Sequence, residues 1–315
     1  MTDLNPEFVE LRQKFRLFYE RELLALFAPM EATRKKYLGC FWALSILSFF
    51  IVSTIGSIYI SIERAPGEDE TELFFALILI LIGICSMSIS SYKKSIKGNV
   101  MEKMISFFGD FSYSYGSKIG FEILAKSKLF SSPTSRTGDD HFQGKYKGVG
   151  ITVSEEKHVV RGGKNRRTTF RGIIILLEMD KPFTGRTVVK KDHGWLLNKF
   201  ESSLWANLGK KVALEDVVFE KYFEAYSNDQ IEARYLLTTA FMERILKVRD
   251  AFDGSSIEFS FFDNNLLIKI PTNKDMFETS SLFSSATDYS RVEEAFDQFC
   301  SVFSIVDILK LTAKA

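Results

Sequence analysis

Apolar positions follow three different patterns along the chain, and each pattern predicts a different kind of element. Near the amino terminus they recur at steps of three and four, which is typical of an amphipathic helix. Two long runs then contain no charged residue, and beyond them short β-branched segments alternate with turn residues. The sequence therefore predicts an α+β chain in three parts, residues 1–36, 37–97 and 98–315.

The two charge-free runs predict membrane-spanning helices. Residues 37–62 make one run of 26 and residues 73–92 make another of 20, and a helix needs about 20 apolar residues to cross a bilayer. A core helix of a soluble protein would carry a polar face. A cleaved signal peptide would not begin after 36 residues, many of them charged. We therefore expect a two-helix transmembrane hairpin.

Charges around these runs predict the orientation of the hairpin. The outer flanks are basic, whereas the connection at residues 63–72 holds one arginine against five acidic residues. Since positive residues stay on the cytoplasmic side, both termini should be cytoplasmic and the acidic loop external. In a bacterium that membrane is the inner membrane. The runs lack the ionisable residues that transport pathways usually contain. Their small residues favour helix packing within the chain or in a homo-oligomer.

The first 36 residues predict an amphipathic helix with Asn5 as its N-cap and Pro6 in its first turn. Pro29 should interrupt this pattern before the basic flank. One face is apolar and needs a surface to cover it, which is either the carboxy-terminal domain of the same chain or a protein partner. The residues of this face are Phe8, Leu11, Phe15, Phe18 and Tyr19.

Residues 98–315 predict a cytoplasmic mixed α+β domain with antiparallel hairpins. A helix should end near Gly109, and a short helix at 120–130 should lead into a loop that lasts to Asp140. Asn264 and Asn265 should form the turn of a late hairpin. An amphipathic helix should close the chain. The remaining expected elements are strands at 144–155, 169–179 and 184–192, the hairpin at 257–271 and the last helix at 289–311.

The stretch "YSNDQIEARYLLT" at residues 226–238 concentrates polar groups ahead of a helical pattern. Ser227 and Gln230 have the spacing of a capping box, and Asp229 would lie in the first turn, where the helix dipole favours negative charge. Thr238 is a candidate cap for a following helix. A catalytic role for Asp229 or Glu232 is the weaker alternative.

A basic tip, "RGGKNRR", separates the first two long strand segments. Near an anionic membrane each basic residue of such a tip contributes about 1 kcal/mol of binding. Contact with lipid or another anion is one interpretation, and a solvated hairpin tip is the other. The residues concerned are Arg161, Lys164, Arg166, Arg167 and Arg171.

Composition excludes several functions. A formal charge of +1 from 41 basic and 40 acidic residues lacks the basic excess of a nucleic-acid-binding domain. The three cysteines have no zinc spacing. The histidines His141, His158 and His193 belong to no metal motif, although "DDH" at 139–141 is a weak candidate. Because sequence motifs of the common hydrolases and nucleotide-binding enzymes are also missing, we expect no metal and no cofactor.

Three segments resemble the bacterial membrane-protein family known as domain of unknown function 3137. They are residues 170–189, 219–245 and 257–271, and the resemblance extends over nearly the whole chain. It implies a bacterial membrane protein with a cytoplasmic α+β domain, and it implies a membrane partner without naming a catalytic residue. The leading interpretation is a non-enzymatic, membrane-anchored interaction or scaffold protein. Its partners would be the bilayer, a membrane protein or further copies of itself. The alternatives are a membrane-associated enzyme and a sensor of anionic lipid or ligand.

Overall fold

The computed structural model describes residues 6–61, 100–163, 165–192, 208–254 and 256–311, with scattered positions between 78 and 98. The chain divides into two compact units. One unit consists of Ile105–Phe277 and Ala295–Ala315, and the other consists of Leu4–Met104 and Glu278–Glu294.

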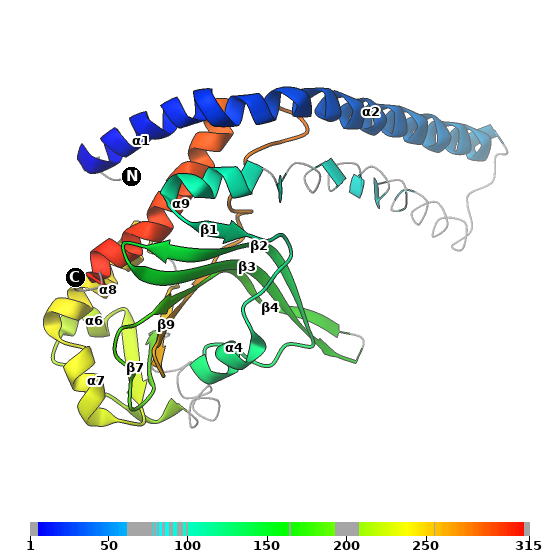
Figure 1. Ribbon diagram of the computed structural model, residues 1–315. Helices are drawn as coiled ribbons and strands as arrows, with labels where there is room; N and C mark the ends of the chain where they lie inside the picture. The colour runs from blue at the N-terminus through cyan, green and yellow to red at the C-terminus, as the bar shows by residue number, and fades with distance from the viewer. Residues whose placement is uncertain are drawn as a thin grey trace. The chain divides into compact units, whose positions relative to one another are not determined.

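The first unit is built on a nine-stranded sheet in the order β1-β2-β3-β4-β9-β8-β5-β7-β6. Every neighbouring pair of strands is antiparallel. This sheet and the helices around it (Figure 1) confirm the predicted mixed α+β fold with antiparallel hairpins. The strands are β1 (Phe111–Tyr113), β2 (Ser135–Tyr146), β3 (Val149–Gly162), β4 (Asn165–Glu178), β5 (Thr187–Lys191), β6 (Lys210–Lys211), β7 (Phe223–Ser227), β8 (Glu258–Phe262) and β9 (Asn265–Pro271).

Three strand predictions differ from the structure. The segment 144–155 is not one strand, because it contains the turn between β2 and β3, where Lys147 and Gly148 adopt positive φ values of 49° and 83°. The expected loop up to Asp140 is wrong, because β2 already begins at Ser135, where its backbone pairs with β3. The expected turn at Asn264 and Asn265 is also displaced by one residue. Asp263 adopts the positive φ of 51° that this turn requires, and Asn265 already pairs with Phe262 in the β8–β9 ladder.

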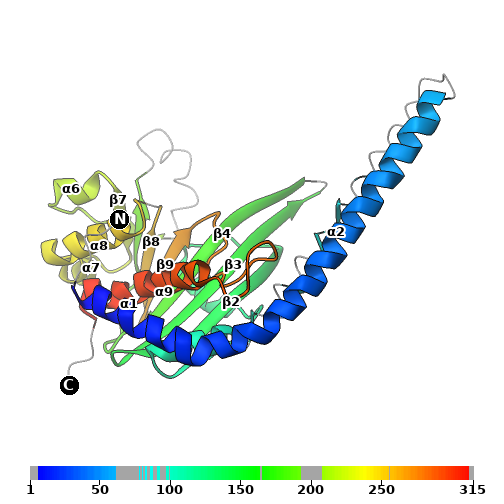
Figure 2. The same cartoon turned by 90° about the horizontal axis from the view of Figure 1, so that it is seen from above.

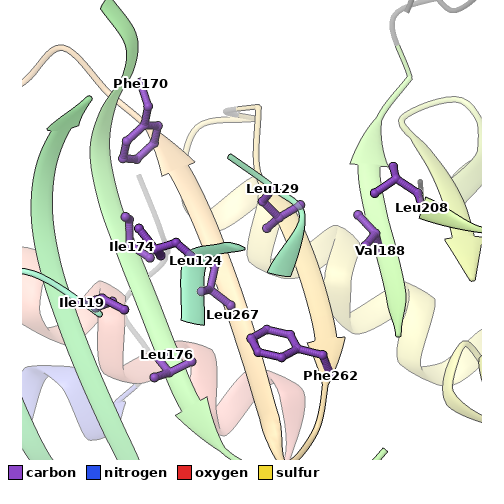
Figure 3. Close-up of a cluster of buried hydrophobic side chains, with 10 residues drawn as sticks. All are labelled: Ile119, Leu124, Leu129, Phe170, Ile174, Leu176, Val188, Leu208, Phe262 and Leu267. Carbon is purple, nitrogen blue, oxygen red and sulfur yellow. The ribbon is translucent and has the colours of Figure 1, made fainter. Parts of the chain in front are cut away.

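Helices cover both faces of the sheet. On one face α4 packs over the buried apolar residues drawn in Figure 3, among them Ile174 and Leu267. On the opposite face the ring of Phe299 from α9 lies 4.9 Å from Phe142 and 4.6 Å from Phe277. The helices of this unit are the 3-10 helix η2 (Ser106–Phe108), α4 (Phe121–Ser127), α6 (Val217–Glu220), α7 (Gln230–Leu236), α8 (Thr239–Ala251) and the end of α9 (Tyr289–Leu309).

Several predicted helices are confirmed in position and burial. η2 ends at Phe108 with Gly109 as its C-cap, and α4 lies within the expected segment 120–130. The hydroxyl of Thr238 caps α8 by accepting a hydrogen bond from the amide of Phe241. The stripe predicted for α9 is buried, and it consists of Val292, Phe296, Phe299, Phe303 and Val306.

The second unit contains a continuous helical rod made of α1 (Pro6–Phe18), a π-helical segment (Tyr19–Leu23) and α2 (Leu24–Ser61), as Figure 2 shows. Its buried side chains include Phe15 and Tyr19. The Tyr19 hydroxyl donates to the Thr287 carbonyl at 3.0 Å, and its ring lies 4.9 Å from that of Tyr289. Tyr19 of the predicted apolar face is therefore covered by carboxy-terminal residues of the same chain.

The expected interruption at Pro29 is wrong, because α2 continues through this residue. The turn that follows is fixed by Glu31, which accepts hydrogen bonds from Arg34 and, at 2.9 Å, from the amide of Ala286. The hydrogen bond from Arg34 is the largest cause that lowers the pKa of Glu31 to about 2, against the opposing effect of burial. These contacts hold the turn although proline removes one helical donor.

The apolar part of α2 is exposed within the described residues. Phe49 and Phe50 keep 69% and 61% of their surfaces accessible, and Trp42 keeps 54%. Among the described residues, one helix is long and apolar enough to cross a membrane, and it is this rod, Val9–Ile58. The loop at 63–72 and most of the second predicted run at 73–92 lie outside the described residues.

Candidate functional site

The basic tip predicted from the sequence is the end of the β3–β4 hairpin. Arg161 pairs with Arg166 across the two strands, Val160 pairs with Arg167, and Lys157 pairs with Arg171. The two strands are the longest of the sheet (Figure 1), so their ladder carries these residues to one end of the unit. Lys164, the remaining residue of the predicted tip, lies outside the described residues.

The hairpin end is exposed and strongly cationic. Arg161, Arg166, Arg167 and Arg171 are all exposed, and no acidic residue occurs anywhere in residues 157–177. Within the part of the chain that the structure describes, no ion pair is recorded for these four arginines. Like charges directly opposite on neighbouring strands destabilise a sheet by roughly 0.2–1 kcal/mol. An anion bound between Arg161 and Arg166 would remove this repulsion.

The predicted capping box at Ser227 and Gln230 is wrong. The N-cap of α7 is Asp229, whose carboxylate accepts hydrogen bonds from the amides of Ile231 and Glu232 at 3.1 and 2.9 Å. Ser227 is the last residue of β7, where the sheet ladder holds its backbone. Its hydroxyl accepts the Asp229 amide at 3.0 Å, so the carboxylate nearer to the helix takes over the role of the cap.

The remaining polar groups of this stretch bind the loop before β5. Glu232 accepts hydrogen bonds from the amides of Thr184 and Gly185, both at 2.7 Å, and Asn228 accepts the Arg186 amide at 2.6 Å. The pKa of Asp229 is lowered, first by the hydrogen bond from the Glu232 amide and then by that from the Thr184 hydroxyl. These side chains therefore join a loop to a helix start, and their acceptor atoms have structural partners.

The histidines and the weak metal candidate are placed as follows. His141 lies in β2 opposite Ser154, and burial lowers its pKa. His193 lies outside the described residues. Carboxylate oxygens of Asp139, Glu155 and Asp275 lie within 4.8 Å of one another without His141; Glu155 is buried, Asp139 is half-buried and Asp275 is exposed.

A buried ionic cluster that the sequence patterns do not predict joins β2 and β3. The carboxylate of Glu156 accepts from the Arg136 guanidinium at 2.6 and 3.0 Å, from Nε2 of His158 at 2.9 Å and from the Ile119 amide at 3.0 Å. Burial alone would raise the pKa of Glu156, but the hydrogen bonds from His158 and Arg136 outweigh it and lower the pKa. The carboxylate is therefore ionised at neutral pH, and Nε2 of His158 lies within hydrogen-bond distance of it.

One signal in the sequence could have indicated this cluster. Glu156 and His158 are two residues apart within a strand segment that is otherwise rich in β-branched residues. In a strand, positions two apart share a face. Two polar side chains on the buried face of a strand require partners, and here the partner is Arg136 on the neighbouring strand.

Comparison with known proteins leads to one family. Residues 168–311 match the family model described as "Protein of unknown function (DUF3137)", and this range contains all three segments that carry the resemblance. No curated protein matches the chain. A solved structure, the mycobacterial trehalose monomycolate transport factor A, is similar with a TM-score of 0.31 and 11% identity, over 65% of this chain and 91% of that one. A similarity this low supports no argument about function. The family match is limited to residues 168–311, less than half of the chain, and it supports a domain of unknown function there.

Proposed function

We propose that this protein is a membrane-anchored interaction module whose α+β domain binds an anionic partner surface through the β3–β4 hairpin. The observation that carries the proposal is the exposed arginine pair Arg161 and Arg166 at the hairpin end, with which none of the described acidic residues forms an ion pair. The anionic surface is the cytoplasmic leaflet of the membrane that anchors the chain. In this proposal the membrane is the bacterial inner membrane, and both termini are cytoplasmic.

The exposed apolar surface of α2 supports the anchor. A helix of this length that belonged to a soluble core would bury its apolar side chains, whereas Trp42, Phe49 and Phe50 are exposed. Residues 37–62 also contain no Asp, Glu, Lys, Arg or His, so no charged side chain opposes the insertion of this segment into hydrocarbon.

The charge of the hairpin supports binding to an anionic surface. Six basic residues and no acidic residue lie between positions 157 and 171. At about 1 kcal/mol for each basic residue near an anionic leaflet, four of them in contact would contribute roughly 4 kcal/mol. The effect falls off within a Debye length of about 8–10 Å, so the anchor is needed to keep the domain close to the membrane.

Reporter fusions test the anchor and its orientation. A reporter that is active only outside the cytoplasm is placed after Gly67, and a second copy is placed at the carboxy terminus in a separate strain. We expect activity from the first fusion and none from the second. Activity from the carboxy-terminal fusion would refute the proposed orientation, and equal inactivity of both would refute the two-span hairpin.

Hydrogen–deuterium exchange tests the hairpin. The full-length protein is placed in nanodiscs of phosphatidylcholine alone or with about one third phosphatidylglycerol, and exchange of residues 157–171 is followed by mass spectrometry. We expect slower exchange only with the anionic lipid, and a loss of this protection in the double variant Arg166→Glu, Arg167→Glu. The matched control, Lys247→Glu, Lys221→Glu, makes the same change of charge at exposed positions elsewhere in the unit. Exchange that does not depend on lipid charge would refute the proposal.

A further inference from the structure

A small cavity lies at the base of the β3–β4 hairpin. Its volume is about 140 Å³, and its walls come from β3, β4, β9 and the loop after α4. The lining residues used below are Phe130, Ser131, His158, Thr169, Phe170 and Lys269. All of them belong to one unit of the chain and to its described residues.

A β-bulge turns the hairpin strand toward this cavity. The register of β3 and β4 shifts between His158, which pairs with Phe170, and Val159, which pairs with Thr168. Thr169 is therefore the extra residue, and both Thr169 and the adjacent Phe170 line the cavity. Bulges of this kind redirect side chains and are frequent next to binding sites.

Two aromatic rings and an ammonium group form one wall of the cavity. The rings of Phe130 and Phe170 meet edge to face at 5.2 Å, and the Lys269 ammonium lies 5.3 and 5.8 Å from their centres. The ammonium donates to the Glu258 carboxylate at 2.6 Å and to the Leu129 carbonyl at 3.2 Å. Because a lysine has three donors, one N–H of Lys269 remains for a ligand.

His158 supplies an acceptor. Its ring is almost completely buried, at 1% exposure, and Nε2 is committed to the ionised carboxylate of Glu156 at 2.9 Å. In the neutral ring Nδ1 then carries the lone pair, and this atom is the ring nitrogen available to a ligand. Arg136 donates from Nε and Nη2 to the same Oε2 of Glu156, and these charge-assisted hydrogen bonds hold the carboxylate in place.

Size and chemistry restrict the ligand. The volume is well below the roughly 300–1,000 Å³ of pockets for drug-sized molecules, so only a group of a few heavy atoms fits. The Lys269 ammonium and the Ser131 hydroxyl can donate to anionic oxygens. The Thr169 hydroxyl, which donates to the His158 carbonyl at a long 3.5 Å, can turn to the ligand instead. In the neutral His158 ring, Nδ1 requires a proton from the ligand. An oxyanion that still carries one O–H satisfies both requirements.

We propose that this cavity binds hydrogen phosphate, either as the free ion or as the phosphomonoester headgroup of a lipid such as phosphatidic acid. Sulfate and phosphodiesters carry no proton at neutral pH, so they leave Nδ1 of His158 unsatisfied and bind more weakly. His158, Thr169 and Phe170 belong to a segment, residues 157–171, that holds six basic residues and no acidic residue, and this positive excess favours the approach of an anion. This site does not depend on contact between the hairpin tip and a membrane.

The test uses two conservative variants of the full-length protein in mild detergent. Thr169→Val removes the hydroxyl of a residue that lines the cavity. Thr168→Val is the matched control on the adjacent residue, which is also exposed and does not line the cavity. Binding of inorganic phosphate and of sulfate is measured by calorimetry at constant ionic strength. The second arm compares thermal stability in nanodiscs that contain phosphatidic acid with stability in nanodiscs that contain phosphatidylglycerol.

The site for the free ion is established if phosphate binds in preference to sulfate in detergent. Thr169→Val should weaken this binding about tenfold or more, and Thr168→Val should leave it unchanged. Stabilisation by phosphatidic acid alone, lost only in Thr169→Val, assigns the site to the lipid. The proposal is refuted if phosphate and sulfate act alike, or if the two variants behave alike in both arms. Arg166→Glu should leave phosphate binding within about twofold in detergent, so failure of the hairpin proposal is recognised separately.

Discussion

Replacement of Glu156 by glutamine is the sharpest test of the buried cluster. The carboxylate is inaccessible to solvent and accepts hydrogen bonds from Arg136, His158 and the Ile119 amide. Glutamine removes the charge and directs an amide group at these donors. The Arg136 guanidinium, whose side chain is 12% exposed, then lacks its counter-ion. Breaking a buried ion pair from one side costs about 3–5 kcal/mol of the free energy of unfolding.

This loss should be visible as a shift in melting temperature. For a unit of roughly 150–250 residues, 1 kcal/mol corresponds to about 2–4 °C, so Glu156→Gln should melt about 6–20 °C below the wild type. Near-ultraviolet circular dichroism of the full-length protein in mild detergent measures the transition. The control Glu243→Gln changes an exposed carboxylate on α8 and should shift melting only slightly.

The dependence on pH provides a second readout. Because the folded protein lowers the pKa of Glu156 from its ordinary value of 4.5, the stabilisation is complete above that value and is lost as the pH falls through the folded pKa. The wild type should therefore lose more stability than Glu156→Gln below about pH 4.5. A melting temperature within about 2 °C of the wild type, or an identical pH profile, would refute the ionic role of this residue.

Three further predictions concern single positions. Gly185→Ala should cost about 1–3 kcal/mol of unfolding free energy, because the added Cβ would lie 2.6 Å from Cβ of Asp229. The control Gly162→Ala adds its Cβ to open space, and equal denaturation midpoints of the two variants would contradict the close approach at Gly185. Thr238→Ala should destabilise α8 by about 1 kcal/mol, with Thr238→Asn close to the wild type, and chemical denaturation checks both. Arg166→Glu should stabilise the hairpin by a few tenths of a kcal/mol by placing opposite charges at Arg161; slower exchange of the tip amides in the absence of lipid would verify this, and faster exchange would contradict it.

The periodic elements could be predicted from the sequence because one-dimensional spacing determines them. The stripe on α9 follows the helical period, and its members Phe296 and Phe303 are buried as expected. β2 could not be predicted in full, because its residues 135–141 are largely polar and lack the apolar alternation of a strand. Their pairing with β3 makes them part of the sheet. Register, a property of two strands, decides that boundary.

The candidate sites divide in the same way. The basic hairpin is visible because its charges are contiguous in sequence, from Arg161 to Arg171. The cluster of Arg136 and Glu156 joins residues 20 apart, and it depends on strand pairing that local patterns do not contain. The cap at Ser227 failed for a local reason, because two neighbouring acceptors compete and only the backbone geometry selects Asp229.

The π-helical segment at Tyr19–Leu23 has a consequence for the whole rod. Buried residues Phe15, Tyr19, Leu23 and Phe27 are spaced by four, and in a regular α-helix each such step would rotate the stripe by about 40°, or about 120° over three steps. A wider turn in the middle absorbs part of this drift. Deleting one residue there would rotate everything that follows by about 100°. The segment therefore determines how the apolar helix α2 is rotated about its axis relative to α1. This short stretch should tolerate changes of residue type far better than changes of length.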